Sequence, residues 1–262
     1  MLAVTADDLG MSDGVTRGVL GAFQRGIVRS ASLLVTYPGS EAAATAARAE
    51  AGLELGLHLD LVGGTPASDP ASVRTLVDRD GRFLGLAAFV RALASGGIDP
   101  RELAREIRAQ AARARSWGLA LAAWDSHRHV HALPLVARVV GPVALEEGAR
   151  WIRRPRPAGV WRGWKPLALT LSAAASEPFY RRLLGNDWYV DVSSWRPREA
   201  GAVAHLATLA GSGEIGAHPG YADDALRSVD TLVERREADL ALLTDPALRT
   251  ALGSAVGWRV PA

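Results

Sequence analysis

Short apolar stretches alternate with longer stretches of helical periodicity along the whole chain. Apolar runs of about four to eight residues bounded by turn residues are typical of buried strands. The predicted strands share this character; they are Leu2–Thr5, Ser32–Thr36, Glu54–Leu57, Ala120–Trp124, Trp151–Arg153, Trp188–Val192, Glu214–Ala217 and Ala255–Val260. Strands that alternate with helices in this way predict a parallel α/β sheet.

Helices are predicted where apolar positions recur three and four residues apart and end signals flank them. Three such helices are Val15–Phe23, Asp99–Trp117 and Leu226–Leu243. Asp99 and Glu102 have the spacing of a capping box, and Gly118 follows the end of the second helix. Gly26 ends the first in the same way.

The number of strand–helix units favours a sheet that closes, or nearly closes, into a barrel. Seven or eight strands, each followed by a helix, in 262 residues favour a (β/α) barrel, complete or missing one unit, over an open doubly wound sheet. No G-x-G-x-x-G follows the first strand and the chain has no P-loop, so nucleotide binding lacks its usual marks. No internal repeat or linker divides the sequence, which predicts one catalytic domain over residues 1–262.

Composition narrows the chemistry. A hydrophobic content of 48% is enough for a sizeable core, and the absence of cysteine excludes disulfides, thiolate metal sites and cysteine nucleophiles. Any metal must therefore be held by His, Asp or Glu. A formal net charge of +2 gives no reason to expect a nucleic-acid partner. With no uncharged run of transmembrane length and no signal-peptide pattern, we expect a cytoplasmic protein without stable membrane insertion, and a homodimer remains open.

Polar residues of the kinds used in catalysis lie at or just after the predicted strands. In strand order they are Asp7 and Asp8, His58 and Asp60, Asp125, His127, His129 and His131, Arg153 and Arg154, Asp191, and His218. In a barrel these positions gather at the carboxyl-terminal mouth, where active sites are found. The sequence therefore predicts one pocket built from distant segments.

Each candidate also has a structural interpretation. Asp7 and Asp8 are either solvated residues before a helix or two carboxylates that point to different sides, one holding a metal and the other free as a base. His58 and His218 each fit either a structural histidine or a functional one, and His205 is assigned no role.

The segment DSHRHVH, residues 125–131, is the strongest of these signals. Histidines at i, i+2 and i+4 lie on one side of an extended chain, a convergence that metal coordination uses. Asp125 is placed to orient a ligating imidazole through its second nitrogen. The other interpretation is a solvated or purely structural histidine cluster.

The stretch from Trp151 to Lys165 mixes arginine with tryptophan. It fits an exposed loop, a lid that stacks on sugars, a membrane-surface contact or a nucleic-acid patch. The pattern alone does not choose among these.

Four motifs in order resemble the YdjC-like carbohydrate deacetylase family, which includes chitooligosaccharide deacetylase. They are TADDLG at residues 5–10, GLHL at 56–59, DSHRHVH at 125–131 and AHPG at 217–220. The resemblance implies a (β/α) barrel related to polysaccharide deacetylases, a divalent metal ion (Mg²⁺ or Zn²⁺) and removal of an N-acetyl group from an amino sugar. The Thr5 position, where the family usually has Asn, and the Trp-rich stretch up to Trp195 depart from the family pattern.

The resemblance also implies roles for individual residues. Asp8, His58 and His127 resemble the metal ligands, Asp7 the catalytic base and His218 the catalytic acid. The remaining candidates would contact the substrate or support the ligands; they are Asp125, His129, His131 and Arg153. Such a set suits amide hydrolysis, which needs an activated water, a stabilised oxyanion and a proton for the leaving amine.

Three other functions compete with a metal-dependent deacetylase acting on an N-acetylated saccharide. A metal-independent glycosidase would pair Asp7 with Asp125 or Asp191. An iron oxygenase would use two histidines and one aspartate as a facial triad, although such sites usually lie on a β-sandwich. A non-catalytic barrel would bind saccharide through the Trp/Arg stretch.

Overall fold

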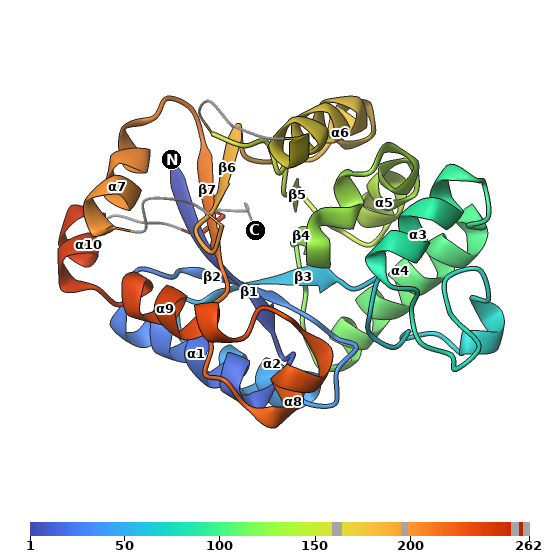
Figure 1. Cartoon of the computed structure of the whole chain (residues 1–262), viewed down its shortest axis with the longest axis horizontal. Helices are drawn as coiled ribbons and strands as arrows, with labels where there is room; N and C mark the ends of the chain where they lie inside the picture. The colour runs from blue at the N-terminus through green and yellow to red at the C-terminus, as the bar shows by residue number, and fades with distance from the viewer. Residues whose placement is uncertain (159–163, 195–198, 253–256, 259–262) are drawn as a thin grey trace.

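Seven parallel strands form one curled, barrel-like sheet flanked by helices (Figure 1). The strands are β1 (Leu2–Leu9), β2 (Ser30–Leu33), β3 (Glu54–Leu59), β4 (Ala123–Ser126), β5 (Trp151–Ile152), β6 (Trp188–Asp191) and β7 (Gly213–Ala217). Their order is β5-β4-β3-β2-β1-β7-β6. An isolated parallel bridge between Pro157 and Tyr189 links the chain beyond β5 to β6.

The structure is a computed structural model that describes residues 1–158, 164–194, 199–252 and 257–258. Its α-helices are α1 (Asp13–Arg25), α2 (Ser40–Arg48), α3 (Leu86–Ala94), α4 (Pro100–Ser116), α5 (Pro134–Glu146), α6 (Trp164–Tyr180), α7 (Ala200–His205), α8 (Asp224–Val229), α9 (Glu234–Leu243) and α10 (Pro246–Ala251). Short 3₁₀ segments are η1 (Pro70–Ser72), η2 (His127–Ala132) and η3 (Leu206–Thr208). Among the described helices none is long and apolar enough to cross a membrane.

The alternation of strands and helices predicted the barrel-like fold correctly. Seven predicted strands correspond to β1–β7, although β1 continues through Asp7 and Asp8 to Leu9, and β4 begins three residues later than expected. The eighth predicted strand, Ala255–Val260, falls mostly outside the described residues.

Aromatic side chains close the amino-terminal end of the sheet interior. Trp151, the first residue of β5, and Trp258 pack with ring centroids 5.5 Å apart in a small apolar cluster. Trp258 occupies space left open by Gly56 of β3, where an added Cβ would lie 2.6 Å from the indole ring. The interior is therefore filled at this end, and the polar residues lie toward the carboxyl ends of the strands.

Two helix predictions need correction. The predicted helix Leu226–Leu243 is broken into α8 and α9, because Asp230 leaves the helix and turns its carboxylate toward buried Arg236. The capping box of α4 is half right: Asp99 accepts from the Arg101 N–H, 2.8 Å away, but Glu102 binds Thr75 instead of reaching back. A tertiary contact therefore replaces the local one.

Candidate active site

A bulge at the end of β1 separates the two adjacent carboxylates. The pairing of β1 with β2 shifts register between Ala6 and Leu9, and Asp8 has a left-handed φ of 66°. Left-handed backbone is strained for a residue other than glycine and is concentrated at functional sites. Both side chains are buried: Asp7 faces Arg153, whereas Asp8 faces His127 and His58.

Asp8, His58 and His127 meet at one point, although they come from β1, β3 and the start of η2. Their candidate ligand atoms all lie within 4.8 Å of one another. Asp8 Oδ1 lies 2.9 Å from His127 Nδ1 and 3.3 Å from His58 Nε2. Ligands about 2.1 Å from one cation lie roughly 3.0–3.4 Å apart, so the three residues fit a divalent metal ion.

Supporting groups fix two of these side chains. Asp125 is in register with His58 on the neighbouring strand, and its Oδ1 lies 2.7 Å from His58 Nδ1, which leaves Nε2 toward Asp8. Arg236 donates to Asp8 Oδ2 across 2.7 Å, which leaves Oδ1 for a ligand. Carboxylate partners of this kind orient metal-binding imidazoles in many metalloproteins.

The electrostatics follow from these contacts. Burial alone would lower the pKa of His58, but Asp125 and Asp8 outweigh it and raise that pKa to about 10. Burial alone would raise the pKa of Asp8, but His127 and Arg236 hold it well below the usual value of an aspartate. The cluster thus keeps an anionic oxygen beside a protonated imidazole, and a metal cation would replace that proton.

Arg153 is the buried cation at the centre of the site. Its guanidinium donates to both oxygens of Asp7 at 2.7 and 2.8 Å, pairs with Asp125 Oδ2 at 2.7 Å and donates to Glu214 at 2.9 Å. Asp7, His58 and Asp125 form a second group with close ligand atoms. Because Arg153 already binds both of its carboxylates, we regard the Asp8 group as the better metal site.

The histidine segment does not adopt the extended conformation that the sequence predicts. Arg128 and His129 both have left-handed backbones, with φ of 56° and 55°, so the three imidazoles do not converge on one point. His127 faces Asp8, His129 packs edge-on against Tyr189 and His131 lies between Ser126 and the Arg153 carbonyl. The prediction that all three converge is therefore wrong.

His131 gives the structure a testable pH dependence. Burial lowers the pKa of this fully buried imidazole to about 4, whereas an unfolded histidine titrates near 6.5. The unfolded chain therefore takes up the proton first. We expect the free energy of unfolding to fall by about 3 kcal/mol between pH 6.5 and 4 on this account.

Urea unfolding at a series of pH values measures this effect. His131→Asn should flatten the pH dependence by that amount, and the matched change His205→Asn, at an exposed position on α7, should leave it unaltered. Equal pH dependence in wild type and His131→Asn would contradict the assignment.

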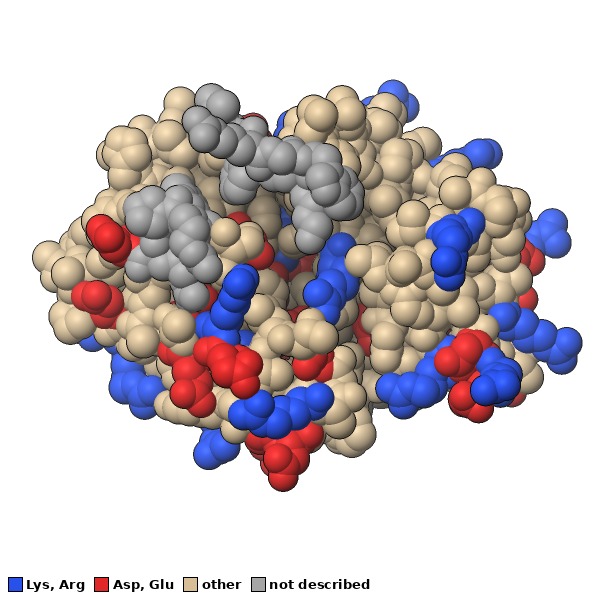
Figure 2. Space-filling model, viewed as in Figure 1, with Lys and Arg blue, Asp and Glu red and all other residues tan. Residues whose placement is uncertain are grey.

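His218 lies on the other side of Asp7 from the histidine segment. Ala217 is in register with Ala6 on β1, so His218 and Asp7 are the next residues on neighbouring strands. His218 Nδ1 lies 2.9 Å from the Ser193 hydroxyl and 3.7 Å from Asp191 Oδ1. The face of the molecule drawn in Figure 2 is hollowed near its centre, with acidic and basic atoms in and around the hollow.

Several polar residues at the site escaped the sequence analysis. They are Arg236 and Asp239 on α9, Asp230 before that helix, Glu214 on β7 and Ser193 after β6. Arg236 lies in the charged run ERRE, residues 234–237, which has the composition of a solvated helix face. One available signal was its spacing four residues before apolar Leu240, which places both on one face of α9.

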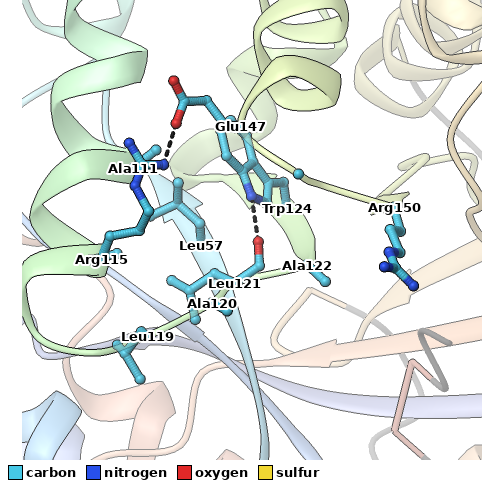
Figure 3. Close-up of a pocket in the computed structure, with 12 residues that line it drawn as sticks. Leu57, Ala111, Arg115, Leu119, Ala120, Leu121, Ala122, Trp124, Glu147 and Arg150 are labelled. Carbon is cyan, nitrogen blue, oxygen red and sulfur yellow. Dashed lines mark hydrogen bonds and ion pairs between the residues drawn. The ribbon is translucent and has the colours of Figure 1, made fainter. Parts of the chain in front are cut away.

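A separate pocket of about 330 Å³ lies against the sheet between α4 and the end of α5 (Figure 3). Its lining includes Leu119–Ala122 before β4, and Gly148 and Arg150 before β5. These segments precede the strands, so the pocket is at the opposite edge from Asp8 and His127. Trp124 closes one wall and donates to the Leu121 carbonyl at 2.7 Å.

Comparison with known proteins places the chain in a family. The model of the YdjC-like protein family matches residues 1–254. Proteins named carbohydrate deacetylase from Brevibacillus brevis and Geobacillus stearothermophilus are 34% and 35% identical over 249 residues. The alignments cover 95% and 94% of this chain and 92% and 89% of those proteins.

A solved structure shows the same fold. A protein from Enterococcus faecalis, described as a cellobiose-phosphate cleavage protein, superposes with a TM-score of 0.83 at 23% identity, over 98% of this chain and 95% of that one. On the strength of the family match and the two relatives, this chain belongs to the YdjC-like protein family.

Proposed function

We propose that the protein is a metal-dependent hydrolase that removes an N-acetyl group from an amino sugar or oligosaccharide. The relatives named carbohydrate deacetylase support the reaction class. The observation that carries the metal dependence is the meeting of Asp8, His58 and His127, with ligand atoms within 4.8 Å of one another.

The donor set favours a particular kind of cation. Two imidazoles and one carboxylate suit zinc and similar transition ions, whereas magnesium prefers oxygen ligands and keeps several waters. We therefore propose Zn²⁺ ahead of Mg²⁺. Acetate release measured with each ion after chelation would rank them.

The steps of amide hydrolysis can be assigned to the metal ion and to individual side chains. A bound divalent ion would lower the pKa of water and polarise the acetyl oxygen. Asp7 would accept the proton of the attacking water, because each of its oxygens keeps a lone pair after bonding Arg153. Arg153 balances the charge of Asp7 and holds its orientation.

His218 would protonate the departing nitrogen, since an amide anion is a poor leaving group. We expect His218→Ala to lower kcat by about a hundredfold while zinc affinity stays unchanged, because the acid contributes to turnover and not to the metal site. Acetate-release kinetics together with calorimetric zinc titration measure both quantities. Full activity in this variant would contradict the acid role.

The competing functions give different results in the same assays. A glycosidase needs one protonated carboxyl, but Arg153 and His58 outweigh burial and lower the pKa of Asp125, so Asp125 is a poor acid. Activity that survives exhaustive chelation would nevertheless favour that function. Sugar binding with neither bound metal nor turnover would identify a binding protein instead.

The test of the proposal is acetate release from N-acetylglucosamine oligomers by zinc-loaded protein. We expect acetate from at least one oligomer and none after chelation. A metal-loaded sample that released no acetate from any N-acetylated saccharide would overturn the proposal.

A further inference from the structure

Ser193 after β6, His218 after β7 and Asp239 on α9 form a hydrogen-bonded chain. The Ser193 hydroxyl lies 2.9 Å from His218 Nδ1 and donates to Asp239 Oδ2 across 2.5 Å. The same carboxylate oxygen accepts the backbone N–H of His218 at 3.0 Å. Ser193 and Asp239 are buried, whereas the His218 side chain is partly exposed.

The direction of the protons in this chain follows from what each group can do. A carboxylate only accepts, so the Ser193 hydroxyl proton points to Asp239. The Ser193 oxygen then accepts from His218, which requires the imidazole proton to be on Nδ1. That leaves Nε2 as the ring nitrogen available to a substrate.

The Asp191 carboxylate also lies near His218 but does not accept a hydrogen bond from the imidazole. Its Oδ1 is 3.7 Å from His218 Nδ1, beyond hydrogen-bonding distance. Its oxygens receive the Ser193 backbone N–H at 2.9 Å and the Ser194 hydroxyl at 3.1 Å. Asp191 therefore shapes the turn after β6 that brings Ser193 against the imidazole.

We propose that Ser193 and Asp239 are positioning residues that keep one proton of His218 on Nδ1, so that the second proton of the imidazolium, on Nε2, is the one delivered to the substrate. The inference rests on the proposed function only for the step that His218 serves. In that step the bond from the acetyl carbon to nitrogen breaks, and the nitrogen takes the Nε2 proton of the imidazolium. Nδ1 keeps its own proton and donates it in a hydrogen bond to the Ser193 oxygen. The water that adds to the acetyl carbon gives a proton to Asp7.

The tautomer can be observed without any assay of activity. Nitrogen NMR of protein labelled with ¹⁵N-histidine distinguishes protonated from unprotonated ring nitrogens, and His218→Ala assigns the signal. For neutral His218 we expect a protonated Nδ1 and an unprotonated Nε2, and a shift of the proton toward Nε2 in Ser193→Ala. A proton on Nε2 in the wild type, or an identical signal in Ser193→Ala, would overturn the proposal.

Kinetics separate positioning from simple packing. Ser193→Ala should lower kcat about ten- to a hundredfold with KM and zinc affinity unchanged, as loss of an outer partner of a functional histidine typically does. Ser193→Thr, which keeps the hydroxyl, should restore the NMR signal and most of the activity.

The matched control is Ser194→Ala, which removes the neighbouring, exposed hydroxyl from the same turn and should change neither property. Equal losses of kcat in Ser193→Ala and Ser194→Ala would show an effect on the turn and overturn the positioning role. If the wild type released no acetate from any saccharide, the proposed function would fail, and the NMR result would still decide the tautomer.

Discussion

The Asp8→Asn variant is expected to bind zinc more than about 100-fold more weakly than the wild type and to release no acetate above background. Loss of a residue that only supports a metal ligand typically weakens metal binding by about 10- to 100-fold, and loss of the ligand itself should weaken it further. Asp8 places an anionic oxygen between His58 and His127, 3.3 and 2.9 Å from their nitrogens. The amide keeps the shape of the carboxylate and its place beside Arg236 but loses the charge. Calorimetric titration of chelator-treated protein with Zn²⁺ measures the affinity.

A second aspartate provides the control for this substitution. Asp13→Asn removes a carboxylate from the exposed first turn of α1, five residues along the chain, and should leave zinc affinity unchanged. Urea unfolding of both variants checks that they remain folded. Wild-type zinc affinity in Asp8→Asn would remove Asp8 from the metal site.

The Arg153→Met variant should lower the free energy of unfolding by about 3–5 kcal/mol and abolish acetate release. Arg153 is fully buried and is the cation shared by Asp7, Asp125 and Glu214. Its loss would leave buried carboxylates without a compensating charge and release Asp7 from its orientation. Urea unfolding at neutral pH measures the first effect and an acetate assay the second.

A surface ion pair provides the control for the loss of stability expected in Arg153→Met. Arg108 of α4 binds Glu146 of α5 at 2.6 Å, but both side chains are about half exposed, at 47% and 57%. Arg108→Met should therefore change the free energy of unfolding by less than about 1 kcal/mol. Similar losses of unfolding free energy in Arg153→Met and Arg108→Met would contradict the role of Arg153 as the buried cation that pairs with three carboxylates.

Much of the fold was predictable because its signals are local. Buried parallel strands are short apolar runs, and their carboxyl ends carry polar residues that any barrel brings to one mouth. This is why the sequence indicated that the polar residues after the strands would lie in one pocket, Asp8 and His127 among them although more than a hundred residues separate these two. The family resemblance then singled out Asp8, His58 and His127 as the ligands. The structure places their ligand atoms within one cluster.

The details that the sequence did not reveal depend on tertiary contacts. The bulge at Asp8 and the left-handed turn at Arg128 and His129 are conformations that residues other than glycine adopt rarely, so the local sequence does not predict them and packing must hold them. The break before α9 depends on Asp230 binding Arg236, and that pair has no periodic signature. Apolar periodicity cannot show which charged residue of a helix turns inward.

The central claim is that one divalent cation is held by Asp8, His58 and His127. The most direct measurement is anomalous scattering from crystals of the protein grown with Zn²⁺. The account predicts one strong anomalous peak about 2.0–2.2 Å from Asp8 Oδ1, His58 Nε2 and His127 Nδ1. A zinc-loaded crystal with no peak at these three atoms, or with its peak between Asp7 and Asp125, would contradict it.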